Sequence, residues 1–451
     1  MERTDYLIIG AGPSGSAAAI ALKNEGKDCI LVDKATFPRV KLCGGLFTGK
    51  AQDALATLVG KEKYADCMSQ CTASRETKFS LWQTEKSPQT GEPVRQRMLV
   101  EVRPRKEIVL IDRPRFDEWM VRHYQSLGGT LIEGDGIVSI DFANHTAHLE
   151  SGRTIAYRTM IAADGANSTV ERLVAAHRAN GTRDLSSSAN SPSPSAPKSH
   201  KKMHTRGNAL CLEINVDRAD CPDADGVQIH FGIIPQSYAW SFSKGDKVCL
   251  GLVKKDNVQT NPHQAFRHFL YSLGVHNIDR YPLRGAMLPF GNYMPHPAYV
   301  FDAQNGNHPD PTLNLSPQTH KHPNLTHSSH PQINAHVPPP PPSILFVGDA
   351  ARLVEPLTGE GIFYALQSGI LAAQSHGDPT QYMHQVSHLH QLISKGDLYQ
   401  HWLMHNPLLH SLLCRQASHH PSFIEHFYST QIEQPTLDSF LKIVWKYKRG
   451  K

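Results

Sequence analysis

Short apolar runs separated by glycine-rich or polar segments divide this chain into expected strands and helices. Residues 6–9 and 29–32 are continuous apolar runs, which predict strands buried on both faces of a parallel sheet. The small residues 16–22 lie between them and predict a helix. The order of strand, glycine turn, helix and strand predicts a βαβ unit at the start of the chain.

The turn after the first strand carries the pattern G-x-G-x-x-G at Gly10, Gly12 and Gly15. Gly10 permits the tight turn, Gly12 lets the backbone approach a pyrophosphate, and Gly15 lets the helix pack against the strand. The free N–H groups at the start of that helix would then face the pyrophosphate. The pattern therefore predicts a dinucleotide site.

Asp33 ends the second strand at the distance expected for an acid that accepts hydrogen bonds from the ribose hydroxyls, about 20 residues beyond the glycines. The alternative is a glycine-rich turn with an exposed Asp33. The order of the elements favours nucleotide binding. This unit alone does not separate FAD from NAD.

The segment that follows predicts further elements of an α/β fold. Residues 109–113 predict a strand that ends in Asp112-Arg113, and residues 115–127 predict a helix. One face of that helix is apolar and comprises Phe116, Trp119, Met120, Tyr124 and Leu127. Residues 130–133, 136–141 and 146–150 predict a β-meander. Residues 159–170 predict a buried strand that ends at Asp164-Gly165 and leads into a helix.

The second half of the chain predicts strands at residues 209–216, 228–234 and 247–253. Tyr238, Trp240 and Phe242 lie between the last two, at every second position. In a strand these three aromatic side chains point to one face. That face is either ordinary core or one wall of a substrate cavity, and the pattern leaves both interpretations open.

A second glycine-rich segment follows a later strand. Residues 343–351 predict a strand that ends in Gly348-Asp349. Residues 355–362 open a helix of small residues at 363–374, and the N-terminus of that helix can hold negative charge.

Two segments are too polar to bury a core. Residues 184–204 are rich in Ser, Pro and Lys and are expected to form a disordered surface insertion. Residues 301–342 are rich in His and Pro. Histidines can bind metals, but without regular ligand spacing a solvated loop is favoured.

Residues 379–451 predict a mostly helical region whose cationic end is either solvated or lies on an anionic membrane surface.

Composition narrows the class of protein. The 451 residues carry a net charge of +5 and 39% hydrophobic residues, with a mean hydropathy of −0.39. This is a globular composition without a nucleic-acid signal. We find no run long enough to span a bilayer and no signal peptide before the first strand. Scattered cysteines without zinc or redox spacing predict free thiols, a cytoplasmic setting and no metal site.

A loop at residues 34–46 contains Cys43, Gly44 and Gly45. Small residues here would let the backbone lie flat against a planar ligand. Cys43 is either a functional thiol beside such a ligand or an ordinary small buried side chain.

Three separated patterns now stand at strand ends, namely G-x-G-x-x-G, Asp164-Gly165 and Gly348-Asp349. In this order they resemble the FAD-binding folds of the p-hydroxybenzoate hydroxylase class. Within that superfamily the chain is most similar to the geranylgeranyl reductase family, near the branch with a flavoprotein linked to colicin M resistance. The stretches that carry the resemblance are Phe37-Pro-Arg39 with Cys43-Gly44-Gly45, Asp112-Arg113 with Phe116-Asp117, Tyr238-x-Trp240-x-Phe242, and Gly348-Asp-Ala-Ala-Arg-Leu-Val-Glu-Pro-Leu-Thr-Gly-Glu-Gly-Ile362.

The resemblance implies roles by position. Ser14 and Gly15 would contact the pyrophosphate, and Asp33 the adenosine ribose. Cys43, Gly44 and Arg113 would lie near the flavin, and Asp349 would hydrogen-bond its ribityl or pyrophosphate region. Gly361 and Ile362 would offer backbone N–H groups to the isoalloxazine ring. Tyr238, Trp240 and Phe242 would line an apolar tunnel, so Cys43, Tyr238 and Trp240 are the expected catalytic residues.

The expected fold is α/β, with a Rossmann-like three-layer ββα FAD-binding domain, an inserted antiparallel substrate sheet and a C-terminal helical region. We assign residues 1–55, 100–183 and 343–378 to the FAD-binding domain, and residues 56–99 and 205–300 to the substrate sheet. Without a second G-x-G-x-x-G, the electron donor is either transiently docked NAD(P)H or a ferredoxin.

The resemblance implies reduction of C=C bonds in a prenyl lipid. A hydroxylase acting on a small aromatic or lipid, or a flavin-binding protein without turnover, are the alternatives. A halogenase would carry the motif Trp-x-Trp-x-Ile-Pro, and in the matching stretch of this chain Trp240 is the only tryptophan. Two departures affect the substrate: Ser243 stands where the family has Pro, and Val253 where it has Gly.

Overall fold

The computed structural model describes residues 1–86, 93–104, 106–181, 208–289, 294, 297–301 and 341–405. The first expected insertion, 184–204, lies outside these residues, as do nearly all of the His/Pro-rich segment 301–342 and the chain beyond residue 405. The expectations of disorder, metal binding and a membrane-facing end therefore fall outside the described part of the chain.

The first sheet is built on the parallel strands predicted from the continuous apolar runs. Its central order is β17-β18-β11-β1-β2-β8, and the hairpin strand β10 pairs with both β11 and β9. The parallel pairs are β1 with β2 and β11, β2 with β8, and β11 with β18. The strands are β1 (Glu2–Ile9), β2 (Cys29–Asp33), β8 (Thr130–Glu133), β9 (Ile137–Asp141), β10 (Thr146–Leu149), β11 (Thr154–Ala162), β17 (Ala298–Val300) and β18 (Ser343–Phe346).

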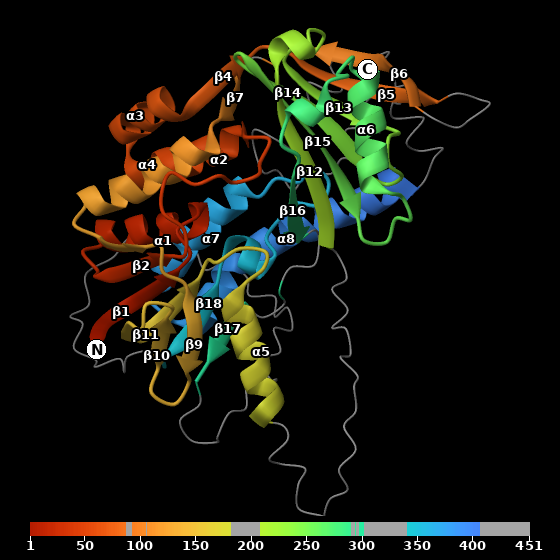
Figure 1. Cartoon of the computed structure of the whole chain (residues 1–451). Helices are drawn as coiled ribbons and strands as arrows, with labels where there is room; N and C mark the ends of the chain where they lie inside the picture. The colour runs from red at the N-terminus through yellow and green to blue at the C-terminus, as the bar shows by residue number, and fades with distance from the viewer. Residues whose placement is uncertain are drawn as a thin grey trace, which may run out of the picture.

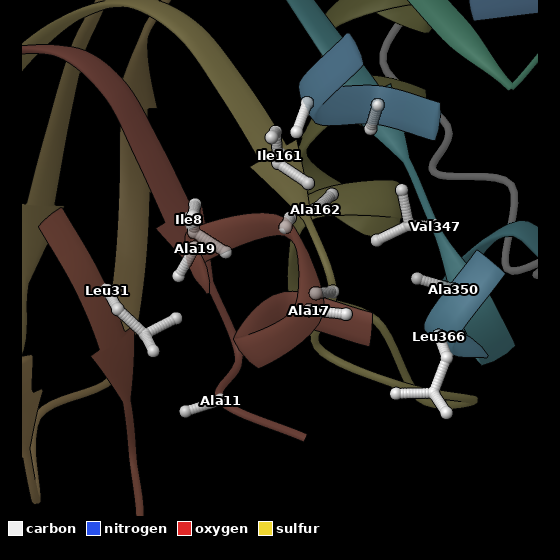
Figure 2. Close-up of a cluster of buried hydrophobic side chains, with 14 of the residues drawn as sticks. Ile8, Ala11, Ala17, Ala19, Leu31, Ile161, Ala162, Val347, Ala350 and Leu366 are labelled. Atoms are coloured by element: carbon white, nitrogen blue, oxygen red, sulfur yellow. The ribbon is translucent and has the colours of Figure 1, made fainter. Parts of the chain in front are cut away.

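Small residues bring helices close to this sheet. The helices α1 (Pro13–Asn24), α4 (Arg113–Ser126) and α7 (Ile362–Gln374) pack beside it, and α1 and α7 touch backbone to backbone (Figure 1). A Cβ on Gly369 of α7 would lie 2.1 Å from the carbonyl oxygen of Ser14, so only glycine allows this approach. Figure 2 shows Ala17 of α1 among the buried side chains of β1, β11 and α7. The close packing sets the first turn of α1 against Gly369, in the middle of α7.

The second sheet is the predicted antiparallel one. Its order is β16-β12-β15-β14-β13-β5-β6, and every pair is antiparallel except β13 with β5. The strands are β5 (Phe79–Lys86), β6 (Pro93–Val102), β12 (Asn208–Asp217), β13 (Val227–Phe231), β14 (Tyr238–Lys244), β15 (Lys247–Lys255) and β16 (Arg284–Pro289). Helix α6 (Pro262–Ser272) packs on the outer face through Phe266 and Phe269 (Figure 1). The other face, here called the inner face, is turned toward the first unit.

A small sheet and two helices join these units. Strands β3 (Leu46–Phe47), β7 (Ile108–Ile111) and β4 (Thr72–Glu76) pair in that order, beside α2 (Gly49–Val59) and α3 (Lys61–Cys71). Helix α5 (Thr169–Gly181) follows β11, and α8 (Pro379–His405) packs against α7 and β18. Cys67 and Cys71 are buried on α3 as free thiols with their sulfurs 3.9 Å apart.

The predicted fold class is confirmed. Of the predicted apolar face of the helix at 115–127, Phe116, Trp119, Met120 and Tyr124 are buried in α4, whereas Leu127 follows the helix and is half-buried. The β-meander is wrong, because the strand at 130–133 pairs in parallel with β2 and only β9, β10 and β11 form the hairpins. Two boundaries also differ. The expected boundary at residue 56 cuts α2, and β17, expected in the substrate sheet, pairs with β18 in the first sheet.

Within the described ranges, no helix is long and apolar enough to cross a membrane.

Candidate functional site

The glycine turn has the geometry that the sequence pattern predicts. Gly10 has a φ of +101° and donates its N–H to the Val32 carbonyl at 2.7 Å. A Cβ on Gly15 would lie 1.8 Å from the Gly10 carbonyl oxygen, so this residue must lack a side chain. Helix α1 begins after Gly12 and no side chain caps it. Its first N–H groups are therefore available to an anion.

Asp33 is buried beside this turn, so the alternative of an exposed carboxylate is wrong. Its Oδ2 accepts the Ala11 N–H at 2.7 Å, and its Oδ1 accepts the Ala35 N–H at 2.9 Å. These bonds hold the turn and the loop after β2 in place. The ribose contact stays a prediction.

A buried group of charges lies next to the turn. Arg113 donates two hydrogen bonds to Asp117, at 2.9 and 3.0 Å, and Arg39 lies 3.3 Å from the same carboxylate. Burial opposes the charge of Arg113, but Asp117 and the Cys43 thiol outweigh it and raise the pKa of this guanidinium. A Cβ on Gly12 would lie 3.5 Å from Arg39 Nη2. Arg39 therefore adds a cation beside the predicted pyrophosphate position.

The other two glycine-acid pairs converge on the same place. A Cβ on Gly10 would lie 2.8 Å from the Asp164 Cα, and one on Gly348 would lie 2.8 Å from the Ser14 Oγ. Asp164 Oδ2 accepts the N–H groups of Thr169 and Val170, whereas its Oδ1 is buried without a partner. Burial raises the pKa of this carboxyl. Gly165 follows with a φ of +84°.

The second glycine-rich segment forms a tight loop before α7. Asp349 Oδ1 would lie 3.6 Å from a Cβ on Gly361, the residue after which α7 begins without a side-chain cap. Thr358 donates its N–H and its hydroxyl to Glu355 Oε2, at 2.6 and 2.7 Å. A rigid loop therefore holds the free N–H groups at the start of α7, from Ile362 onward. Donors held in fixed positions are what stabilisation of an anionic ring requires.

A buried ion pair anchors this loop to α2. Glu360 is paired with Lys50, and Thr48 donates its hydroxyl to the same carboxylate. Burial raises the pKa of Glu360, and the Lys50 ammonium opposes that rise. The Lys50 ammonium also lies 5.0 Å from the Phe363 ring centroid. These contacts fix the loop at residues 355–361 against the segment that follows Cys43.

The aromatic side chains of β14 close the site from the second sheet. Tyr238 donates its hydroxyl to the Thr358 carbonyl at 2.7 Å, and burial raises its pKa. A Cβ on Gly44 would lie 2.7 Å from the Phe242 ring and 3.3 Å from Trp240 Nε1. Cys43 is partly buried and its sulfur accepts the Gly45 N–H at 3.4 Å. The inner face thus meets both the Cys43 loop and the loop before α7.

The two departures from the family pattern have structural consequences. Ser243 donates its N–H to the Gly226 carbonyl at 3.0 Å, a bond that proline could not make. Val253 is buried in the apolar cluster of the inner face, together with Trp240 and Phe242. Both residues are accommodated within the sheet.

The structure adds residues that sequence reasoning did not assign, namely Arg39, Lys50, Asp117 and Glu360. Arg39 and Asp117 stood in stretches that carried the resemblance, but no role followed from them. Lys50 and Glu360 are far apart in the chain, and only the fold brings them together.

The cradle fits FAD: α1 and α7 both begin without a side-chain cap, glycines occupy the positions of closest approach, and Arg39 supplies a cation. Gly10, Gly12, Ser14, Gly15 and Asp33 would hold the adenosine half. Cys43, Gly44, Asp349, Gly361 and Ile362 would hold the flavin half.

Comparison with known proteins decides between FAD and NAD. Residues 3–205 match the family model described as an FAD binding domain. This chain is an FAD-dependent oxidoreductase. The match covers the glycine turn, Asp33, Cys43 and Asp164 of this flavoprotein.

Two curated relatives and one solved structure resemble most of the flavoprotein. It is 26% identical to a menaquinone reductase of Mycolicibacterium smegmatis over 397 residues, which is 84% of this chain and 78% of that one. It is 22% identical to digeranylgeranylglycerophospholipid reductase 2 of Methanosphaera stadtmanae, covering 99% of this chain and 97% of that one. A geranylgeranyl bacteriochlorophyll reductase-like protein of Thermoplasma acidophilum has the same fold, with a TM-score of 0.59 and 16% identity over 100% of this chain and 97% of that one.

Proposed function

We propose that this flavoprotein reduces C=C bonds of a prenyl lipid of the geranylgeranyl type. One observation carries the proposal: the aromatic inner face of the second sheet is hydrogen-bonded through Tyr238 to the loop that would hold the flavin ring. An apolar wall in this position suits an apolar chain. The likeness to a menaquinone reductase and to a digeranylgeranylglycerophospholipid reductase supports the same class of substrate.

Bound FAD, once reduced, supplies the hydride that such a reduction needs. The chain's own residues bind and orient the flavin and the prenyl chain. The N–H groups of Gly361 and Ile362 would stabilise negative charge on the ring. Tyr238, Trp240 and Phe242 would hold the prenyl chain and exclude water, and Cys43 would lie between ring and chain.

The partners and the setting are part of the same proposal. We expect a prenyl lipid substrate, no nucleic acid, and a cytoplasmic protein with peripheral membrane contact through its C-terminal segment. The electron donor is NAD(P)H or a ferredoxin.

Anaerobic reduction tests the function directly. The purified protein, loaded with FAD, is reduced with dithionite and mixed with a geranylgeranylated glycerolipid, while the flavin absorbance is recorded. We expect the flavin to be reoxidised by this lipid and not by the fully saturated lipid of equal length. Mass spectrometry should show two added hydrogens per reduced bond.

Two results would contradict the proposal. If the flavin is reoxidised only by oxygen and the lipid gains an oxygen atom, the protein is a hydroxylase. If no prenyl lipid reacts while FAD binds tightly, the protein acts by binding.

A further inference from the structure

Glu213 lies on the inner face of the second sheet, in register with the aromatic wall. On β12 it pairs with Gly251 of β15, and Gly251 pairs with Trp240 of β14. Residues opposite each other in antiparallel strands share a face. A Cβ on Gly251 would lie 2.1 Å from the Trp240 ring, so the indole extends across β15 toward β12. Glu213 is therefore the acidic member of a row that begins with Trp240.

Two polar atoms in this row are buried without a hydrogen-bond partner. They are Oε2 of Glu213 and Nε1 of Trp240. An unpartnered buried polar group costs about 1–3 kcal/mol, so two in one row call for an explanation. Apolar side chains would serve a purely structural wall better. We therefore expect the polar atoms of this row to take part in binding or in chemistry.

The surroundings of Glu213 favour its neutral form. Burial raises the pKa of this carboxyl, and Lys244, Cys249, Asn215 and the Cys43 N–H oppose the rise. The titratable and charged groups that face it come from every neighbouring element: Lys244 on β14, Cys249 on β15, Cys211 on β12, Cys43 in the loop, and Arg284 in register on β16. The same groups would stabilise a carboxylate formed transiently.

The two acids of the loop before α7 are engaged. Glu360 is held by Lys50 and Thr48, and Glu355 Oε2 accepts two bonds from Thr358. The Tyr238 proton is donated to the Thr358 carbonyl.

The inner-face thiols are also poor proton donors. Burial raises the pKa of Cys211 and of Cys249 far above neutrality. Among the described residues of the inner face, Glu213 combines an acidic proton with a free oxygen.

We propose that the Glu213 carboxyl, in its acid form, donates the proton that completes reduction of the prenyl double bond. This inference rests on the proposed function. The double bond loses its π pair and gains two C–H bonds: one carbon receives the hydride with its electron pair, and the other receives the Glu213 proton. Glu213 is left as a carboxylate beside Lys244 and regains a proton from solvent.

Infrared spectroscopy tests the protonation state without turnover. The FAD-loaded oxidised protein is compared with Glu213→Gln, and with Glu101→Gln as a matched control, because Glu101 is exposed on edge strand β6 of the same sheet. Near neutral pH, wild type and Glu101→Gln should show a protonated-carboxyl band that Glu213→Gln lacks. Identical spectra for wild type and Glu213→Gln would overturn the proposal.

Single-turnover kinetics test the proton transfer. In Glu213→Gln, reoxidation of the reduced flavin by prenyl lipid should slow by about 100-fold or more, whereas reduction by dithionite and lipid binding should stay unchanged. Glu101→Gln should match wild type. Glu213→Asp keeps the carboxyl proton on a shorter side chain, so its reoxidation rate should lie between those of wild type and Glu213→Gln. This variant also provides the test if Glu213→Gln does not fold.

The pH profile adds a readout that a structural role would not move. In wild type the reoxidation rate should fall as the pH rises through the raised Glu213 pKa, and this step should be absent in Glu213→Gln. If wild type reoxidises with lipid and Glu213→Gln is equally fast, this inference alone fails. If wild type itself does not react with any prenyl lipid, the proposed function fails and the inference with it.

Discussion

Buried polar groups are paired to different degrees in the two halves of the site. In the nucleotide-binding unit most of the buried charges are fully paired: Asp33 holds two N–H groups, Asp117 holds Arg113 and Arg39, and Glu360 holds Lys50. The exception is Asp164, whose Oδ1 has no partner. On the inner face of the second sheet, Glu213 and Trp240 each keep one polar atom unpaired.

The difference corresponds to two tasks: the first unit binds the cofactor, whereas the inner face of the second sheet faces the proposed reaction. Paired charges make a rigid frame, which is what a permanently bound cofactor needs. Unpaired groups destabilise the free protein, and they persist where a ligand or a reaction uses them. Changes in the first unit should therefore cost stability, whereas changes on the inner face should cost function.

The largest effect on stability is expected for Asp117→Asn. The substitution leaves Arg113 and Arg39 without their shared carboxylate, and removal of one partner of a buried ion pair costs about 3–5 kcal/mol. The Asp117 side chain is fully buried. Urea unfolding at neutral pH measures the loss.

Asp112→Asn is the matched control, at the N-cap position of the same helix. Asp112 makes an exposed pair with Arg115 at 3.9 Å, and such pairs contribute about 0–1 kcal/mol. If Asp117→Asn and Asp112→Asn lower the free energy of unfolding equally, the paired buried charges of this unit do not contribute the stability that we assign to them.

A smaller, pH-dependent effect is expected for His230 in the second sheet. Burial lowers the pKa of His230 to about 3, below its ordinary value of 6.5. The folded state thus prefers the neutral ring, so its stability contribution is complete above pH 6.5 and is lost as the pH falls toward 3. One proton changes stability by about 1.4 kcal/mol per pH unit, or about 2 kcal/mol between roughly pH 6.5 and 5.

His230→Phe should remove this pH dependence. The ring packs against Phe269 with centroids 5.0 Å apart, and phenylalanine keeps that contact. Urea unfolding of both proteins across this pH range gives the two slopes. His390, whose pKa burial lowers to about 4, remains and keeps part of the slope. Parallel slopes would show that His230 does not titrate on unfolding.

The stability effect expected for Glu213→Gln has a sign opposite to that of Asp117→Asn. The pKa of Glu213 is higher in the folded than in the unfolded protein, so ionisation opposes folding as the pH rises above about 4.5. Glutamine stays neutral. The variant should gain stability relative to wild type as the pH rises, measured by the same unfolding experiments, and a loss at high pH would contradict an unpaired Glu213.

Local sequence patterns predicted the parts of this molecule that depend on neighbours in the chain. Continuous apolar runs located β1, β2, β11 and β18, and the glycine spacing located the turn at Gly10. Alternation placed Tyr238, Trp240 and Phe242 on one buried face.

Pairing between distant segments was not predictable in the same way. The strand at residues 130–133 has the same apolar pattern whether it joins a meander or pairs with β2, because pattern fixes the face and not the partner. Lys50 and Glu360 carry no local signal of their ion pair. Glu213 lies in a strand that the alternating pattern predicted. Its proposed role, however, depends on Trp240, which lies two strands away across Gly251.

The strand order of the first sheet also sets when the cofactor site comes into existence. Strand β11 pairs with β18, and the loop and helix that would hold the flavin ring follow β18 near residue 362. A nascent chain that ends before Ser343 has the complete glycine turn but neither Asp349 nor the N-terminus of α7. We therefore expect flavin incorporation to be a late event in biosynthesis, after most of the polypeptide has left the ribosome.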